Sequence, residues 1–244
     1  MIGAIARVTA RQLLGRRRTA LLVLAAAIPA VLAVVLQIAG GDDPGIRDGF
    51  IEGVLVGLVV TLLMPLVALI LGTTAFGAEI DDGTIVYLLA KPIPRRTIVL
   101  VKWSVAAAIA AALAGVATVV AGVIGLAGAA DAVSVAIGYA VAVAVGSVVY
   151  VAAFVALSLF TSRALIIGLL YVLVWEGALA GSFPGIRFLS VRQYVLAIAD
   201  ALGAPVGVDP LDPAVAVALA GLVVLIALGL AIRRLSGFEI PQSD

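Results

Sequence analysis

The sequence contains no cysteine and no histidine. These absences exclude disulfides and thiol catalysis, together with most zinc, haem and iron–sulfur sites. Charged residues are also scarce, since they make up only 12% of the 244 residues, whereas a soluble domain carries about 25%. The formal net charge of +1 gives no reason to expect a nucleic-acid partner. We therefore predict no metal, no cofactor and no catalytic residue.

A nucleotide-binding motif is missing as well. The pattern Gly-x-x-x-x-Gly-Lys-Ser/Thr, whose backbone amides and lysine hold nucleotide phosphates, occurs nowhere in the chain. We therefore expect that this chain does not hydrolyse ATP by itself and is not an enzyme.

Hydrophobic residues are abundant instead and account for 64% of the chain. This composition predicts an all-α polytopic membrane protein. Six apolar runs are long enough to cross a bilayer core of about 30 Å, namely residues 19–39, 54–76, 98–127, 133–160, 164–181 and 213–232. We predict that residues 19–244 form a single six-span transmembrane domain. Pro29 and Pro65 are expected to kink the first two spans, and Lys102 and Trp103 to mark the membrane interface of the third.

Small residues recur at a spacing of four in the third and fourth spans: Ala107, Ala111 and Gly115, then Gly138, Ala142 and Gly146. This spacing allows helix backbones to approach closely in lipid. The alternative is that both spans are simply rich in alanine and glycine.

Residues 1–18 precede the first span and carry a basic pattern. Arg7, Arg11 and Arg18 fall on one helical face, and Ile2, Ala6, Thr9 and Leu13 share another. This pattern predicts an amphipathic helix in the headgroup plane of the membrane. A basic tail without fixed structure is the alternative.

Basic residues predict the orientation. With six spans, both termini lie on the same side as the loop at residues 77–97. All lysines and arginines except Arg47, Arg187 and Arg192 fall on or next to that side. The positive-inside rule then predicts a cell-membrane protein with cytoplasmic N- and C-termini. Residues 40–53 are expected to form a solvated outer loop and residues 182–212 a longer outer segment, in which 191–202 forms a short surface helix or a re-entrant piece.

The cytoplasmic loop at residues 77–97 mixes acids, bases, glycine and proline densely. Asp81 or Asp82 can cap a helix that begins near Gly83. Pro92 disfavours helix at the preceding residue, and Pro94 suits the first turn of the next helix. Arg95 and Arg96 would lie in that first turn, where the helix dipole disfavours cations. Lipid phosphates or contacts to a partner protein would have to favour them.

The same loop carries a motif: Glu79-x-x-x-Gly83-Thr84-x-x-x-Leu88-Leu89-x-x-Pro92-x-x-Arg95-Arg96-x-x-x-x-x-Lys102. This motif, placed after the second of six spans, resembles that of the membrane subunit of ATP-binding cassette (ABC) exporters of the type-2 permease class. The basic N-terminus and the six spans extend the resemblance over nearly the whole chain.

The resemblance implies that residues 79–89 form a coupling helix, which docks into a separate ABC ATPase subunit. It further implies that a second permease copy or a homologue completes the transport pathway in the bilayer. The residues expected to couple to the ATPase are Glu79, Asp82, Gly83, Thr84, Tyr87, Leu88, Pro92, Arg95 and Arg96. The resemblance names no substrate.

One acid, Glu176, lies inside the fifth span next to Trp175. A charge near the bilayer centre costs roughly 2.5–3.5 kcal/mol. Glu176 is therefore a candidate polar site on the transport pathway, or else a buried anchor or an interface residue.

Three other functions remain open on the sequence. A secondary transporter would usually show internal repeats and more polar spans. A lipid-modifying membrane enzyme would cluster acids from several elements at one membrane face, whereas Glu79, Asp81 and Asp82 all lie in one loop. A non-transporting membrane anchor is the third alternative.

Overall fold

The structure is a computed structural model that describes residues 2–40, 43–83, 93–179 and 184–237. Every regular element in these ranges is a helix, so the prediction of an all-α membrane protein is confirmed for the described residues. The elements are α1 (Ile2–Leu13), α2 (Arg16–Gly40), α3 (Pro44–Phe50), η1 (Ile51–Leu63), α4 (Met64–Asp81), α6 (Arg95–Gly125), α7 (Ala132–Phe160), α8 (Ala164–Leu170), η2 (Tyr171–Leu179), η3 (Pro184–Leu189), α9 (Val191–Ala201) and α10 (Pro213–Ser236).

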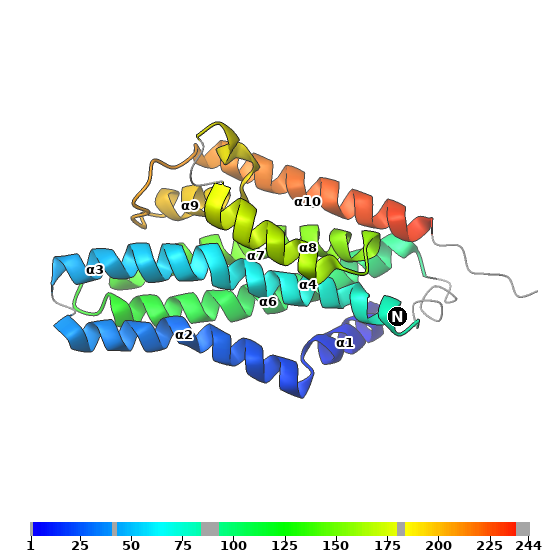
Figure 1. Ribbon diagram of the computed structural model, residues 1–244, viewed down its shortest axis with the longest axis horizontal. Helices are drawn as coiled ribbons and strands as arrows, with labels where there is room; N and C mark the ends of the chain where they lie inside the picture. The colour runs from blue at the N-terminus through cyan, green and yellow to red at the C-terminus, as the bar shows by residue number, and fades with distance from the viewer. Residues whose placement is uncertain (1, 41–42, 84–92, 180–183, 238–244) are drawn as a thin grey trace, which may run out of the picture.

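The long helices lie side by side in one elongated bundle (Figure 1). The end that carries α1 also holds the C-terminus of α4, the N-terminus of α6 and the C-terminus of α10. We call it the basic end, because Arg17, Arg96, Arg163 and Arg233 lie in or next to these segments. The opposite end carries the turn between α6 and α7 and the start of α10 (Figure 1).

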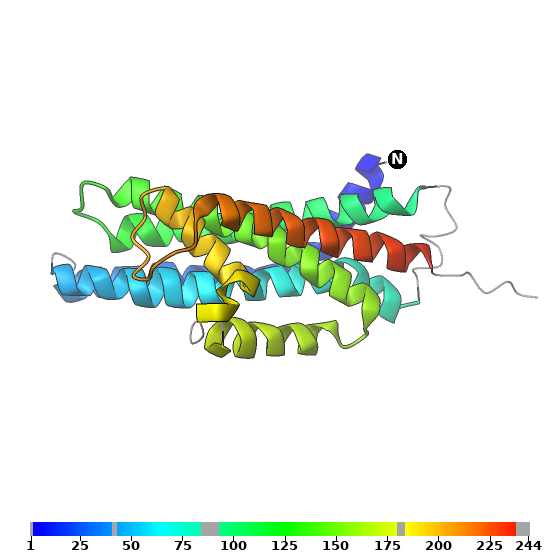
Figure 2. The ribbon, with the colours of Figure 1, turned by 90° about the horizontal axis from the view of Figure 1, so that it is seen from above.

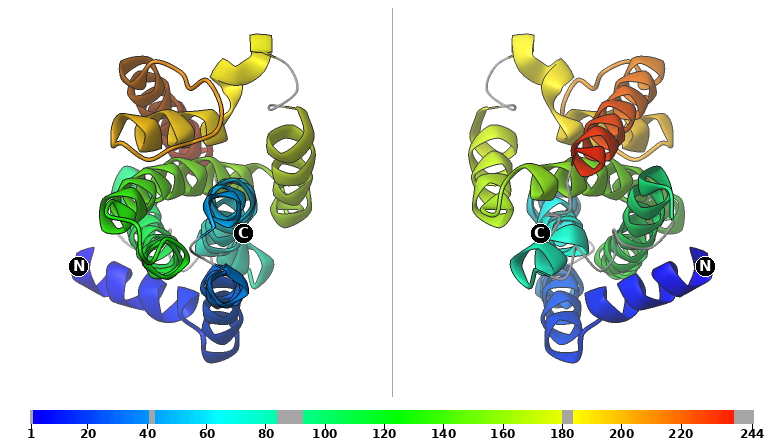
Figure 3. Two further views of the ribbon diagram at one scale, coloured as in Figure 1. Left: turned by 90° about the vertical axis from the view of Figure 1, so that its left-hand side faces the viewer. Right: turned by 90° about the vertical axis from the view of Figure 1, so that its right-hand side faces the viewer.

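Helix α7 lies in the middle of the bundle, as the end-on views show (Figure 3). It packs against α4, α6, α8, α9 and α10. The α6–α7 contact depends on small residues, since a Cβ added at Gly122 would lie 2.7 Å from the Cβ of Ala136. Of the two rows predicted from their spacing, Gly138, Ala142 and Gly146 are all buried. A Cβ at Gly146 would lie 2.4 Å from Val195 of α9, so the close-approach interpretation applies there.

Five helical stretches are long and apolar enough to cross a membrane: Arg17–Gly40, Pro44–Gly77, Arg95–Gly125, Ala132–Phe160 and Pro213–Ser236. The predicted fifth span is different, because only a shorter apolar helix, Ala164–Ala178, is described there. At 1.5 Å per residue the described part of this helix is about 22 Å long, less than the bilayer core of about 30 Å, and residues 180–183 after it lie outside the described ranges. The chain then continues through η3 into α9, which runs obliquely to the bundle axis (Figure 2).

The second span begins earlier than the sequence predicted. Residues 44–50, expected in a solvated loop, are the helix α3, which continues through η1 into α4. The Asp43 side chain accepts a hydrogen bond from the Gly45 amide at 2.8 Å, and Pro44 occupies the first turn, so the helix is capped in the standard way. Phe50 is buried, and a Cβ added at Gly125 of α6 would lie within 2.6 Å of its ring.

The middle of this span is wound as a π-helix, over Ile51–Leu63. The Thr61 hydroxyl donates to the Val56 carbonyl, five residues earlier, at 2.8 Å. The winding returns to α at Met64, next to Pro65, which has no backbone N–H to donate. Pro65, where a kink was predicted, thus lies at the change from π to α winding.

At the N-terminus, α1 covers Ile2–Leu13 and packs against α4 and α6. Thr9 and Leu13 are buried, while Arg7 and Arg11 are exposed, as the amphipathic pattern predicts. A break at Leu14 and Gly15 separates α1 from α2, so Arg18 belongs to the first membrane-spanning helix and not to α1.

We predict that Gly122→Ala lowers the thermal unfolding midpoint of the purified protein in detergent. The added methyl group meets Ala136, whose Cβ and Cα cannot move unless α7 shifts, and overpacking of this kind costs about 1–3 kcal/mol. The matched control is Gly221→Ala in α10, where no atom lies within 4 Å of the added Cβ. That variant gains helix propensity of up to about 1 kcal/mol. Equal midpoints for the two variants would contradict the close α6–α7 contact.

Candidate functional site

The motif residues that the structure describes gather at the basic end of the bundle. Glu79 lies in the last turn of α4, and Asp82 and Gly83 follow it and are exposed. Gly83 has φ of +67°, a conformation that favours glycine and that ends α4. The helix of the second span therefore continues to Asp81.

The other half of the motif begins with Arg95 and Arg96 in the first turn of α6. Thr84, Tyr87, Leu88 and Pro92 fall in residues 84–92, outside the described residues, and so does the predicted helix that begins near Gly83.

An ion pair joins α4 to α6 directly beside this loop. Lys102 Nζ of α6 lies 2.6 Å from Glu79 Oε1, and the two side chains are 2% and 17% exposed. The same ammonium group donates to the backbone oxygen of Ala75 at 2.6 Å and lies 4.7 Å from the centre of the Phe76 ring. Lys102 of α6 therefore contacts three residues near the end of α4: Ala75, Phe76 and Glu79.

Lys102, which was predicted to mark the membrane interface, is buried within the bundle. Its charge is satisfied inside the bundle by Glu79, the Ala75 carbonyl and the Phe76 ring, and its apolar stem can be buried at little cost. Trp103, its predicted companion, is half-buried and donates to the Val148 carbonyl of α7 at 3.3 Å.

Arg95 connects α6 to the C-terminus of α10. Its Nη1 donates to the backbone oxygens of Leu235 at 2.6 Å and Ser236 at 3.1 Å. These carbonyls belong to the last turn of α10, which is the negative end of that helix dipole. The sequence analysis had considered lipid phosphates or a partner protein as the groups that favour Arg95. The structure adds a third, the C-terminal carbonyls of α10. Arg96 is exposed.

Glu176 occupies the second polar site, within the predicted fifth span. Its side chain is fully buried. Its carboxylate accepts hydrogen bonds from the Tyr171 hydroxyl at 2.9 Å, from the Ser190 hydroxyl and from the Val191 amide at 3.0 Å. Ser190 and Val191 form the N-terminus of α9. The carboxylate therefore joins the end of η2 to the start of α9. It lies at the N-terminus of α9, where the helix dipole favours a negative charge.

Two partners of Glu176 were not predicted, although the sequence carries signals for them. Ser190 precedes Gln193 by three residues, which is a capping-box pattern, and its Oγ accepts from the Gln193 amide at 3.3 Å. Tyr171 lies five residues before Glu176, and only the π winding of η2 brings residues at this spacing onto one side.

Within the described part of the chain, no three Asp or Glu side chains group closely enough to hold a metal ion. The polar contacts at these two sites hold helices together. Glu79 and Lys102 join α4 to α6, Arg95 joins α6 to α10, and Glu176 joins η2 to α9.

Comparison with models of known protein families identifies the family of this chain. A family model described as ABC-2 family transporter protein matches residues 14–177, more than half of the chain. The chain belongs to the ABC-2 transporter family. It has no significant match among curated proteins.

Membership of the ABC-2 family makes this chain the membrane component of a transporter. In this family the membrane subunit is normally non-catalytic, and the ATPase is not part of it. The matched residues run from the start of α2 into η2, so they include Glu79, Arg95, Lys102 and Glu176 and leave out α10.

We predict that Glu79→Gln destabilises this ABC-2 protein by roughly 1–3 kcal/mol, because the Lys102 charge remains buried without its anionic partner. Differential scanning fluorimetry in detergent measures the change. Asp82→Asn is the matched control, since it removes a charge three residues away from an exposed side chain. The double variant Glu79→Gln/Lys102→Met should recover part of the loss. Equal effects of the two single variants would refute a stabilising role for the ion pair.

At the second site, Glu176→Gln is expected to fold normally. Its amide oxygen can accept from Tyr171 and Val191, and its NH2 group can donate to the Ser190 oxygen. Glu176→Leu leaves those donors without an acceptor, at about 1–3 kcal/mol for each buried group. Unfolding midpoints that fall equally in both variants would contradict this hydrogen-bonded geometry.

Proposed function

We propose that this chain is the permease subunit of an ATP-driven ABC exporter, coupled through the loop at residues 77–97 to a separate ATPase subunit. The observation that carries the proposal is the fixing of both ends of the loop. Glu79 and Lys102 hold α4 to α6, and Arg95 holds α6 to α10. A displacement of the loop would therefore move three membrane-spanning helices instead of bending one.

The surface offered to the ATPase includes the exposed residues Asp82, Gly83 and Arg96. Thr84, Tyr87, Leu88 and Pro92 complete it in this proposal. Because Glu79 faces Lys102, it acts as a positioning residue that orients the loop, and it need not touch the ATPase.

The basic end of the bundle faces the cytoplasm of the cell in this proposal. Arg7, Arg11, Arg96 and Arg163 are exposed at or beside this end, where they can meet anionic lipid headgroups. This orientation places both termini and the coupling loop in the compartment that contains ATP.

The transport pathway is proposed to form between two permease subunits, either two copies of this chain or this chain and a homologue. Helices α2 and α10 support this arrangement, because they expose large apolar side chains such as Leu21, Leu24, Leu222 and Leu225. Such surfaces are suited to lipid and to a second membrane subunit.

One observation favours a second candidate function, that of a secondary transporter. Transporters of that kind often bind substrate or ions at helix ends inside the membrane, and the buried Glu176 lies at the N-terminus of α9. Transport by Glu176→Gln separates the two functions. ATP-driven export should persist if Glu176 is an anchor, whereas ion-driven transport through this carboxylate should be lost.

The coupling proposal is tested by co-purification with the ATPase encoded by a neighbouring gene. We expect that the ATPase co-elutes with the wild-type chain and that Asp82→Arg lowers the recovered ATPase at least tenfold, because a reversed charge lies on the docking surface. Asp48→Arg, an equally drastic change at an exposed position near the opposite end, is expected to have no effect. Co-elution that survives Asp82→Arg would exclude this loop as the docking surface.

A further inference from the structure

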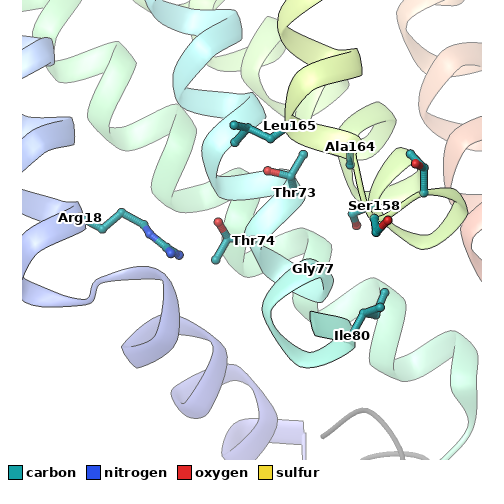
Figure 4. Close-up of a pocket in the computed structure, with 10 residues that line it drawn as sticks. Arg18, Thr73, Thr74, Gly77, Ile80, Ser158, Ala164 and Leu165 are labelled. Atoms are coloured by element: carbon teal, nitrogen blue, oxygen red, sulfur yellow. The ribbon is translucent and has the colours of Figure 1, made fainter. Parts of the chain in front are cut away.

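A pocket of about 180 Å³ lies between α2, α4 and the α7–α8 turn (Figure 4). Its lining includes Arg18 of α2, Thr73 and Thr74 of α4, and Ser158, Thr161 and Ser162 around the end of α7. A single water needs only about 10–15 Å³ of such space, so the pocket accommodates a polar group of several non-hydrogen atoms.

Arg18 supplies the positive charge of the pocket. Its side chain extends from α2 towards Thr74 (Figure 4), and it is exposed. Within the part of the chain that the structure describes, Arg18 forms no ion pair. A guanidinium group binds phosphate oxygens through two parallel hydrogen bonds, so an anionic phosphate is the ligand group that suits it.

The other side of the pocket offers acceptors. The hydroxyls of Thr73, Thr74 and Ser158 donate to the backbone oxygens of Leu69, Ile70 and Val155 at 2.7, 2.6 and 2.8 Å. Their protons are used within their own helices, so these three oxygens present lone pairs to the pocket. A ligand that satisfies both sides carries a phosphate next to a group with several N–H donors.

Apolar side chains beside the pocket indicate that this ligand is an amphiphile. Leu165 lines the pocket and is 51% exposed, and Leu21, three residues after Arg18 on α2, is 68% exposed. Acyl chains can cover these side chains, which free phosphate cannot. Basic pockets between membrane helices on the cytoplasmic side, where the proposed orientation places this pocket, bind phosphate-bearing headgroups such as those of cardiolipin and phosphoinositides.

We propose that this pocket binds the headgroup of a phosphatidylethanolamine-type lipid, with the phosphate on Arg18 and the ammonium group donating to Thr73, Thr74 and Ser158. This site does not depend on coupling to an ATPase, and it assigns a lipid ligand to a polar cluster outside the loop and outside the Glu176 site.

Binding to the full chain in detergent tests the proposal, with native mass spectrometry counting bound lipid. Phosphatidylethanolamine is compared with phosphatidylcholine, which has the same charges but no N–H donor. We expect about tenfold tighter binding of the ethanolamine lipid, and loss of about tenfold in affinity for both lipids in Arg18→Gln. Arg17→Gln, which removes the neighbouring exposed charge outside the pocket lining, should bind as the wild type does.

Thr74→Val provides a second variant, which removes one acceptor and keeps the shape of the side chain. It should reduce the preference for ethanolamine over choline and leave phosphatidylcholine binding unchanged. The proposal is overturned by equal binding of the two lipids to the wild type, or by equal effects of Arg18→Gln and Arg17→Gln. It is also overturned if inorganic phosphate displaces the lipid at equal concentration, which would assign the pocket to free phosphate. Unfolding midpoints without lipid verify that the variants are folded.

Discussion

The ion pair between Glu79 and Lys102 is the contact on which the basic end of the structure depends. A buried pair of this kind contributes little net stability, but it is costly to break and it fixes one geometry. Here it fixes the end of α4 against α6, and the neighbouring Arg95 fixes α6 to the end of α10. The loop between α4 and α6 is thus attached to a rigid set of helices, as a loop that transmits motion must be.

A second buried contact lies in the predicted fifth span, where the carboxylate of Glu176 binds the start of α9. The described apolar helix there, Ala164–Ala178, is shorter than the five long candidate spans, and α9 runs obliquely to the bundle axis. Polar groups at a helix end within a membrane must be satisfied inside the protein. Glu176 does this, because it accepts from the first amide of α9 and from two hydroxyls. The buried acid and the N-terminus of α9 therefore form a single polar site.

The sequence was sufficient for the fold class and for most spans, because apolar runs and basic clusters are properties of composition. The resemblance stated from the loop motif agrees with the family that the chain belongs to. The sequence could not reveal that Lys102 faces Glu79, that Arg95 reaches α10, or that Ser190 caps α9 onto Glu176, since these contacts join segments far apart in the chain. The predicted start of the second span was wrong, because Asp43 caps a helix that already begins at Pro44.

The rate of ATP hydrolysis in proteoliposomes tests the central claim most directly. The candidate ATPase subunit is measured alone, with the wild-type chain and with the Glu79→Gln chain. The account predicts that the wild-type chain recruits the ATPase to the membrane and changes its rate, and that Glu79→Gln recruits it but changes its rate much less, because the loop is no longer fixed to α6. A folded wild-type chain that leaves both the location and the rate of the ATPase unchanged would contradict it.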